Sequence, residues 1–160
     1  MTGRDNASDS SEHAVIAEIE IMAPPERVFQ ALTDESQLVR WFSDPSCLTE
    51  TYDFEPRRGG RWRFVTREAE KPANGVTRFE AEGEILEFEP PRLLVYTWVA
   101  NWHSDPGLRT VVRWELDPIP GGTRVRVTHS GLQSDPVARK DYAGGWVGVL
   151  KYLQQFLAPA

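Results

Sequence analysis

Cysteine is almost missing from this sequence. Cys47 is the one cysteine among 160 residues, so the chain cannot build an internal disulfide framework. Chains without disulfides are typical of reducing compartments, and we therefore predict a cytoplasmic protein.

Long apolar runs are missing as well. No stretch approaches the ~20 apolar residues that a membrane-spanning helix needs. The opening residues, MTGRDNASDSSEH, contain no apolar segment of the kind that a secretory signal requires. We predict no membrane insertion, a disordered tail over residues 1–13, and one folded domain over residues 14–160, which is an ordinary domain length.

Positive charge and reactive motifs are scarce. The 18 Lys and Arg residues are outnumbered by 24 Asp and Glu, and a formal net charge of −6 argues against nucleic-acid binding. Three histidines and one cysteine show no metal-ligand spacing, and no phosphate loop, dinucleotide fingerprint or GxSxG elbow occurs. We predict no nucleic-acid partner, no metal, no cofactor and no nucleophilic catalytic residue.

What the sequence does contain is a clear succession of periodic segments. AVIAEIEIM alternates apolar and polar residues, which predicts a half-buried strand. APPERVFQALTD and ESQLVRWF follow as two short helices, the first with a proline at its start. From Thr51 to about Leu132 there are five or six strands separated by Gly and Pro turns, and Asp135 then caps a long terminal helix.

This order predicts an α+β protein. Consecutive strands with short connections form an antiparallel sheet, and helices at both ends of the chain pack on it. Within the strand segment, two neighbouring strands alternate charged and apolar residues; one carries Arg61, Arg63 and Arg67 and the next carries Glu80, Glu82 and Glu84. These rows predict a solvated outer face, with a recognition surface as the alternative.

Six segments together carry a family resemblance: APPERVFQALTD, RWF, RRGGRWRF, GEILEFEPPRLLVYTW, GGTRVRVTHSGL and GGWVGVLKYLQQFL. In this order, from about Val15 to Leu157, the chain resembles the activator of heat-shock protein 90 ATPase-like family of the START/Bet v-like helix-grip superfamily. The resemblance implies a curved antiparallel sheet of about seven strands, with two short helices and a long C-terminal helix that enclose a cavity.

Glycines in the terminal helix raise a question about that cavity. Gly144, Gly145 and Gly148 lie beside Trp146 in an amphipathic stretch, although each weakens a helix by roughly 1 kcal/mol relative to Ala. One interpretation is that Gly145 borders the cavity and lets a ligand approach the backbone. The alternative is that the glycines end a short helix as a C-cap.

Aromatic residues and one histidine supply the candidate site. His129 shares the inward parity of Val125 and Val127, so it either orients a ligand or is a structural histidine bonded within the core. The parity of strand 83–89 is ambiguous because Ile85 and Phe88 disagree, which a β-bulge would resolve. The candidate ligand-binding residues, some of which could be plain core, are Trp41, Phe42, Phe64, Phe79, Tyr96, Trp98, Trp114, His129, Trp146 and Leu150.

Three functions follow from these observations. The first is binding of a small hydrophobic or aromatic molecule in the cavity, by a monomer or a homodimer. The second is a cavity enzyme of the polyketide cyclase or aromatase type, which would need His129 to meet Tyr96 or Asp53. The third, implied by the family resemblance, is a co-chaperone-like interaction module.

Overall fold

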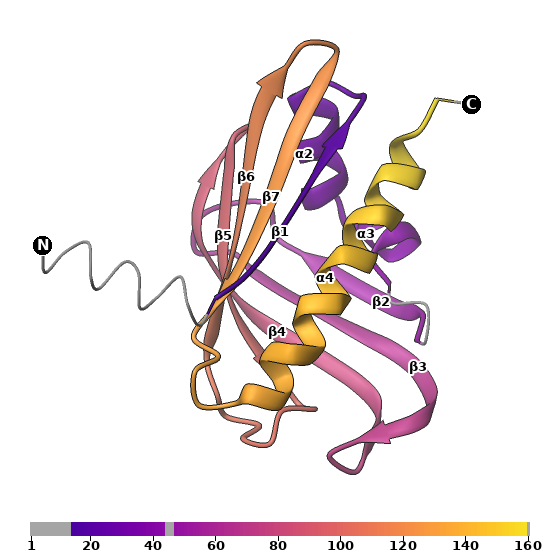
Figure 1. The fold of residues 1–160 in the computed structure, drawn as a ribbon, viewed down its shortest axis with the longest axis vertical. Coiled ribbons are helices and arrows are strands. Elements are labelled where there is room, and N and C mark those ends of the chain that lie inside the picture. The colour runs from indigo at the N-terminus through magenta and orange to yellow at the C-terminus, as the bar shows by residue number, and fades with distance from the viewer. Residues whose placement is uncertain (1–13, 44–46, 160) are drawn as a thin grey trace, which may run out of the picture.

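The computed structural model describes residues 14–43 and 47–159, which form one curled sheet and three helices (Figure 1). The predicted tail over residues 1–13 lies outside the described residues. In chain order the elements are β1 (Val15–Ile21), α2 (Pro25–Thr33), α3 (Glu35–Trp41), β2 (Thr49–Phe54), β3 (Arg61–Ala73), β4 (Val76–Glu89), β5 (Leu93–Ala100), β6 (Thr110–Ile119), β7 (Gly122–Ser130) and α4 (Pro136–Leu157).

The seven strands form a single antiparallel sheet in the order β1-β7-β6-β5-β4-β3-β2. β1, the first strand of the chain, closes one edge by pairing with β7, the last. In Figure 1, α4 runs diagonally across the curled sheet, while α2 and α3 lie near the C-terminal end of α4. The α+β helix-grip architecture expected from the sequence is confirmed.

The helices begin where the sequence predicts. Pro25 occupies the first turn of α2, and the Asp34 carboxylate caps α3 by accepting a hydrogen bond from the Ser36 amide at 3.0 Å. The Asp135 carboxylate accepts from the Ala138 amide at 3.1 Å and so caps α4, as expected. No helix within the described ranges is both long enough and apolar enough to cross a bilayer.

The connections between strands also follow local chemistry. Asn74 and Gly75 both have positive φ, 50° and 78°, and form the two-residue turn between β3 and β4. Between Ile85 and Glu87 the pairing of β4 with β5 shifts register. This bulge resolves the conflict of parity, because Ile85 is buried while Phe88 packs edge-on against Phe29 of α2 at 5.4 Å.

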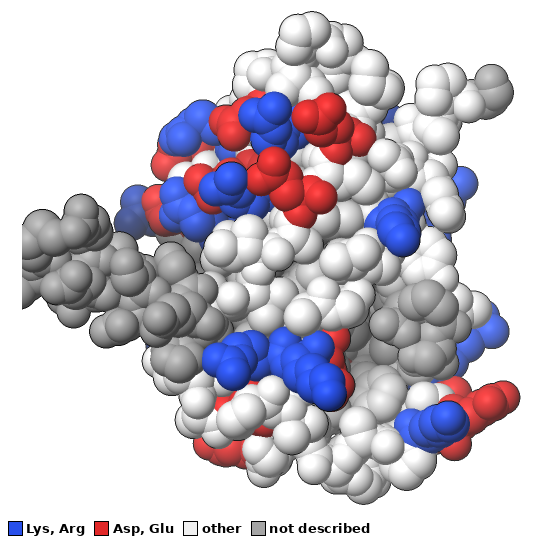
Figure 2. Space-filling view, in the orientation of Figure 1, with Lys and Arg blue, Asp and Glu red and all other residues white. Residues whose placement is uncertain are grey.

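The outer face of the sheet carries the charged rows. Arg61 and Arg63 pair in register with Glu84 and Glu82, and all four side chains are exposed. Further along the sheet the Arg126 guanidinium lies 2.9 Å from the Glu18 carboxylate. Figure 2 shows acidic and basic side chains interleaved where Figure 1 places β1, β7 and β6. The prediction of a solvated outer face is confirmed.

Candidate ligand-binding cavity

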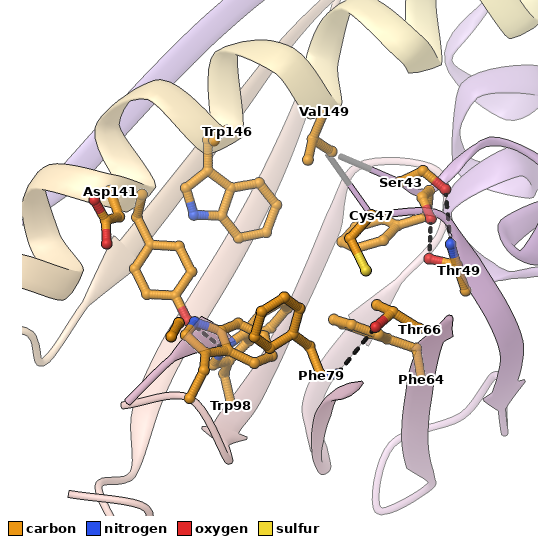
Figure 3. Close-up of a pocket in the computed structure, with 15 residues that line it drawn as sticks. Ser43, Cys47, Thr49, Phe64, Thr66, Phe79, Trp98, Asp141, Trp146 and Val149 are labelled. Carbon is orange, nitrogen blue, oxygen red and sulfur yellow. Dashed lines mark hydrogen bonds between the residues drawn. The ribbon is translucent and has the colours of Figure 1, made fainter. Parts of the chain in front are cut away.

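A cavity of about 280 Å³ lies between the N-terminal half of α4 and the sheet (Figure 3). Trp146 and Val149 project from α4 toward Phe64, Thr66, Phe79 and Trp98 of the sheet, and residues 42–43, 47 and 49 lie on the remaining side. The lining residues are Phe42, Ser43, Cys47, Thr49, Phe64, Thr66, Ala73, Phe79, Trp98, Trp102, Asp141, Tyr142, Gly145, Trp146 and Val149.

Three pairs of neighbouring aromatic rings in this lining stand at steep angles to one another. The Phe79 and Trp102 rings meet at 74°, with their centroids 5.5 Å apart, and the Trp98 and Trp102 rings meet at 83° and 6.1 Å. Phe42 and Trp146 meet at 77° and 6.2 Å. Edge-to-face pairs of this kind are favourable, and they hold these rings in different orientations along the wall.

Most polar groups of the lining are already bonded within the protein. The Thr66 hydroxyl donates to the Arg67 carbonyl at 2.9 Å and accepts from the Phe79 amide at 3.0 Å. The Thr49 hydroxyl donates to the Phe42 carbonyl, and the Cys47 thiol donates to the Arg67 carbonyl at 3.1 Å. A guest in the cavity therefore meets apolar surface and few groups that require a hydrogen bond from it.

Asp141 is the exception among the lining residues. It lies on α4 one turn before Gly145, its side chain is exposed, and none of the described residues forms a hydrogen bond or ion pair with its carboxylate. The described lining includes no Lys, Arg or His. Asp141 is thus the one formal charge on the described wall of the cavity.

A hydrogen-bonded group centres on Tyr142, which lines the cavity. The Trp98 indole N–H donates to the Tyr142 hydroxyl at 2.9 Å, and His103 Nε2 lies 2.7 Å from the same oxygen. Burial raises the pKa of the Tyr142 phenol well above its usual range, indole hydrogen bonds offset only part of the rise, and the Asp135 and Asp141 carboxylates add to it. Tyr142 therefore stays neutral.

His129 belongs to a second buried group. Its Nδ1 accepts the Trp146 indole N–H at 3.1 Å, so the neutral ring carries its proton on Nε2 and donates to the Thr110 hydroxyl at 2.8 Å. The Thr110 hydroxyl donates in turn to the Trp98 carbonyl at 2.9 Å. Burial lowers the pKa of His129 to about 3. Both ring nitrogens are therefore committed to the core.

The structure divides the ten predicted site residues into two groups of five. Phe42, Phe64, Phe79, Trp98 and Trp146 line the cavity. The others are buried but lie outside its wall: Trp41, Tyr96, Trp114, His129 and Leu150.

The five residues outside the wall have partners in the core. Trp41 donates its indole N–H to the Ala31 carbonyl at 2.9 Å, and Trp114 donates to the Tyr96 hydroxyl at 2.9 Å. Both ring nitrogens of His129 have hydrogen-bond partners in the core, and Leu150 is packed in the same hydrophobic core. Inward-facing parity therefore identified buried residues correctly, but it did not separate the core from the cavity wall.

Sequence reasoning missed several lining residues. Trp102, Cys47 and Thr49 lie in or beside loops, where no periodicity indicates a direction. Tyr142 and Val149 did carry a signal, because they share the apolar stripe of α4 with Trp146. Of that stripe, only Trp146 and Leu150 were predicted to contact a ligand.

Gly145 borders the cavity, as one of the two interpretations predicts. α4 is continuous from Pro136 to Leu157, and neither Gly144 nor Gly145 has a positive φ, so the C-cap alternative is wrong. A Cβ added at either glycine would meet no atom within 4 Å. Packing around these positions therefore does not require glycine.

A second hollow, of about 590 Å³, lies on the surface where β1 begins beside the start of α4. Its described lining contains short aliphatic residues with Arg139 and Lys140. None of the ten predicted site residues borders it. No cluster of three or more His, Cys, Asp or Glu suited to a metal ion occurs among the described residues.

Comparisons with known proteins agree with this architecture. A family model described as Activator of Hsp90 ATPase homolog 1-like protein matches residues 22–158. A solved protein from Mesorhizobium loti is 31% identical, with a TM-score of 0.70 over 90% of this chain and 96% of that chain. One from Chromobacterium violaceum is 21% identical, with a TM-score of 0.75 over 92% and 99%.

A third similar structure is DynU16, a protein of the dynemicin biosynthetic locus. It is 19% identical, with a TM-score of 0.70 over 91% of this chain, and this chain spans 47% of DynU16. At that identity the likeness shows the fold alone. No curated protein matches the sequence.

Proposed function

Because the chain belongs to the Activator of Hsp90 ATPase homolog 1-like family and has its sheet curled against a long terminal helix, we propose that it binds a small, largely apolar aromatic molecule. The guest occupies the cavity beneath α4. One observation carries this proposal: a volume of about 280 Å³ is bounded by seven aromatic residues whose neighbouring polar groups are bonded within the protein.

The dimensions and chemistry of the cavity support such a guest. Small-molecule sites commonly enclose about 300–1,000 Å³ and are lined mostly by hydrophobic and aromatic side chains. This cavity lies just below that range, which suits a guest of one to three rings.

A pair of matched substitutions on α4 tests the proposal. Val149 lines the cavity, whereas Val147, two residues earlier, is 45% exposed and does not. Val149→Phe fills the cavity and should weaken binding of the neutral fluorescent probe N-phenyl-1-naphthylamine by roughly 10-fold, which corresponds to about 1.4 kcal/mol. Val147→Phe adds the same bulk outside the cavity and should leave the affinity unchanged.

Native mass spectrometry of freshly purified protein provides a second measurement. A retained small molecule that is present in the Val147→Phe protein and lost in Val149→Phe would support the proposal. Equal probe binding by both variants, or no saturable binding by the unmodified protein, would contradict it.

The residues proposed for the alternative function, a cavity enzyme, do not meet in the cavity. His129 and Tyr96 lie outside the cavity wall, and Asp53 is exposed on β2. The three side chains do not converge on the space beneath α4. The cavity as described favours holding a guest over acid–base chemistry by this set.

A further inference from the structure

We infer that the guest is a cation: an aromatic or compact apolar molecule that carries an amine or quaternary ammonium group near Asp141. This inference rests on the proposed function and names the chemical class of its ligand. It follows from three features of the described cavity lining, which are its single carboxylate, its aromatic rings and the open space at Gly145.

The first feature is the charge of the wall. Asp141 supplies a negative charge without a partner among the described residues, and no basic side chain of the described lining opposes it. Asp141 precedes Tyr142 on α4, and both residues border the cavity, so the Asp141 carboxylate lies at the cavity wall. The field of this carboxylate disfavours a carboxylate or sulfonate guest and favours an ammonium group.

The second feature is the set of aromatic rings. The π-face of an aromatic ring is negative, and a cation within about 6 Å of a ring centroid is attracted to it. Phe79, Trp98 and Trp102 all line the cavity, and Trp102 meets the other two rings at 74° and 83°, so the wall presents aromatic surfaces of different orientation. Aromatic surfaces of this kind are suited to quaternary ammonium groups, which are weakly hydrated.

The third feature is room beside the carboxylate. Asp141 and Gly145 are separated by four residues and lie on the same face of α4. Both border the cavity, and no atom lies within 4 Å of the position that a Gly145 Cβ would occupy. A cationic group can therefore approach the helix backbone next to Asp141 while the apolar body of the guest lies deeper among the rings.

Two isosteric probes separate charge from shape. Phenyltrimethylammonium and tert-butylbenzene have nearly the same size, and the first carries a positive charge. We expect the cation to bind roughly 10-fold more tightly, as judged by saturable changes in tryptophan fluorescence. Benzenesulfonate, an anion of similar bulk, should bind more weakly than either.

Asp141→Asn should weaken binding of phenyltrimethylammonium by about 3- to 5-fold, because the carboxylate is exposed and the pair is partly screened by solvent. The affinity for tert-butylbenzene should not change. Asp117→Asn, at an exposed carboxylate on the outer face of β6, is the matched control and should affect neither probe. Added salt should reduce binding of the cation to the unmodified protein and have little effect on the Asp141→Asn variant.

The outcomes distinguish this inference from the proposed function. Tighter binding of tert-butylbenzene than of phenyltrimethylammonium would overturn the inference and leave the cavity as a site for neutral guests. Equal loss of cation affinity in Asp141→Asn and Asp117→Asn would also overturn it, because the effect would then come from net charge. Failure of both probes to bind would overturn the inference together with the proposed function.

Discussion

The indole N–H of Trp146 donates a hydrogen bond to Nδ1 of His129 over 3.1 Å, which joins α4 to β7 in the middle of the core. Trp146 also lines the cavity, whereas His129 is fully buried behind it. The same contact therefore fixes one wall of the cavity and commits the histidine to a structural role.

This arrangement predicts a dependence of stability on pH. His129 has a pKa near 3 in the folded protein and about 6.5 when unfolded, and burial also lowers the pKa of His103. The unfolded chain therefore binds more protons below pH 6.5, and stability falls as the pH is lowered from there. We expect His129 to contribute a loss of up to about 1.4 kcal/mol per pH unit between pH 6 and 4.

Chemical unfolding between pH 7.5 and 4.5 measures this loss, and NMR of the folded protein tests its cause. The His129 ring signals should remain those of the neutral Nε2–H form throughout that range. A His129 midpoint near 6 would refute the assignment of the ring as a saturated core residue.

Gly145→Ala should stabilise the protein and weaken binding of N-phenyl-1-naphthylamine. The added methyl meets no atom within 4 Å and gains roughly 1 kcal/mol of helix propensity, a rise of about 2–4 °C in Tm for a chain of this size. The methyl also enters the cavity.

Gly144→Ala is the control for this substitution, because Gly144 is also helical and open but does not line the cavity. It should raise Tm by a similar amount and leave the affinity for N-phenyl-1-naphthylamine unchanged. A clear loss of stability in Gly145→Ala would show that the position needs glycine for its backbone conformation.

Arg63→Ala should change the free energy of unfolding by less than about 1 kcal/mol. The Arg63 side chain pairs with Glu80 on the outer face, where both are more than two-fifths exposed. Urea denaturation measures the change, and binding of N-phenyl-1-naphthylamine should be unaffected. A loss of affinity would indicate that the charged rows communicate with the cavity, contrary to this account.

The fold could be predicted from the sequence because local patterns of residues specify its strands and helices. Alternation placed Val125, Val127 and His129 on one face of β7, and Asp135 marked the start of α4. The conflict between Ile85 and Phe88 left the parity of β4 open, and the register shift between Ile85 and Glu87 resolves it, since a shift of one residue reverses the side on which each side chain lies.

Only half of the predicted site residues line the cavity, because the position of a cavity depends on how far apart the helix and the sheet lie, which local sequence patterns do not reveal. Tyr96 and Trp98 share a face of β5, but Trp98 borders the cavity and Tyr96 is bonded to Trp114 in the core. The alternation of residues along a strand shows which face of the sheet a side chain lies on. It does not show whether that side chain packs in the core or borders a cavity. Trp102 follows β5 in a loop, and only the completed fold brings it to the wall.

The central claim is that a guest occupies the space beneath α4, and the indole N–H signals of the six tryptophans test it most directly. During titration with N-phenyl-1-naphthylamine, the signals of Trp98, Trp102 and Trp146 should shift with one saturation curve, because these residues line the cavity. The signal of Trp114 should shift much less, since its N–H is bonded to Tyr96 outside the wall. Absence of saturable shifts, or equal shifts of Trp114 and Trp98, would contradict the account.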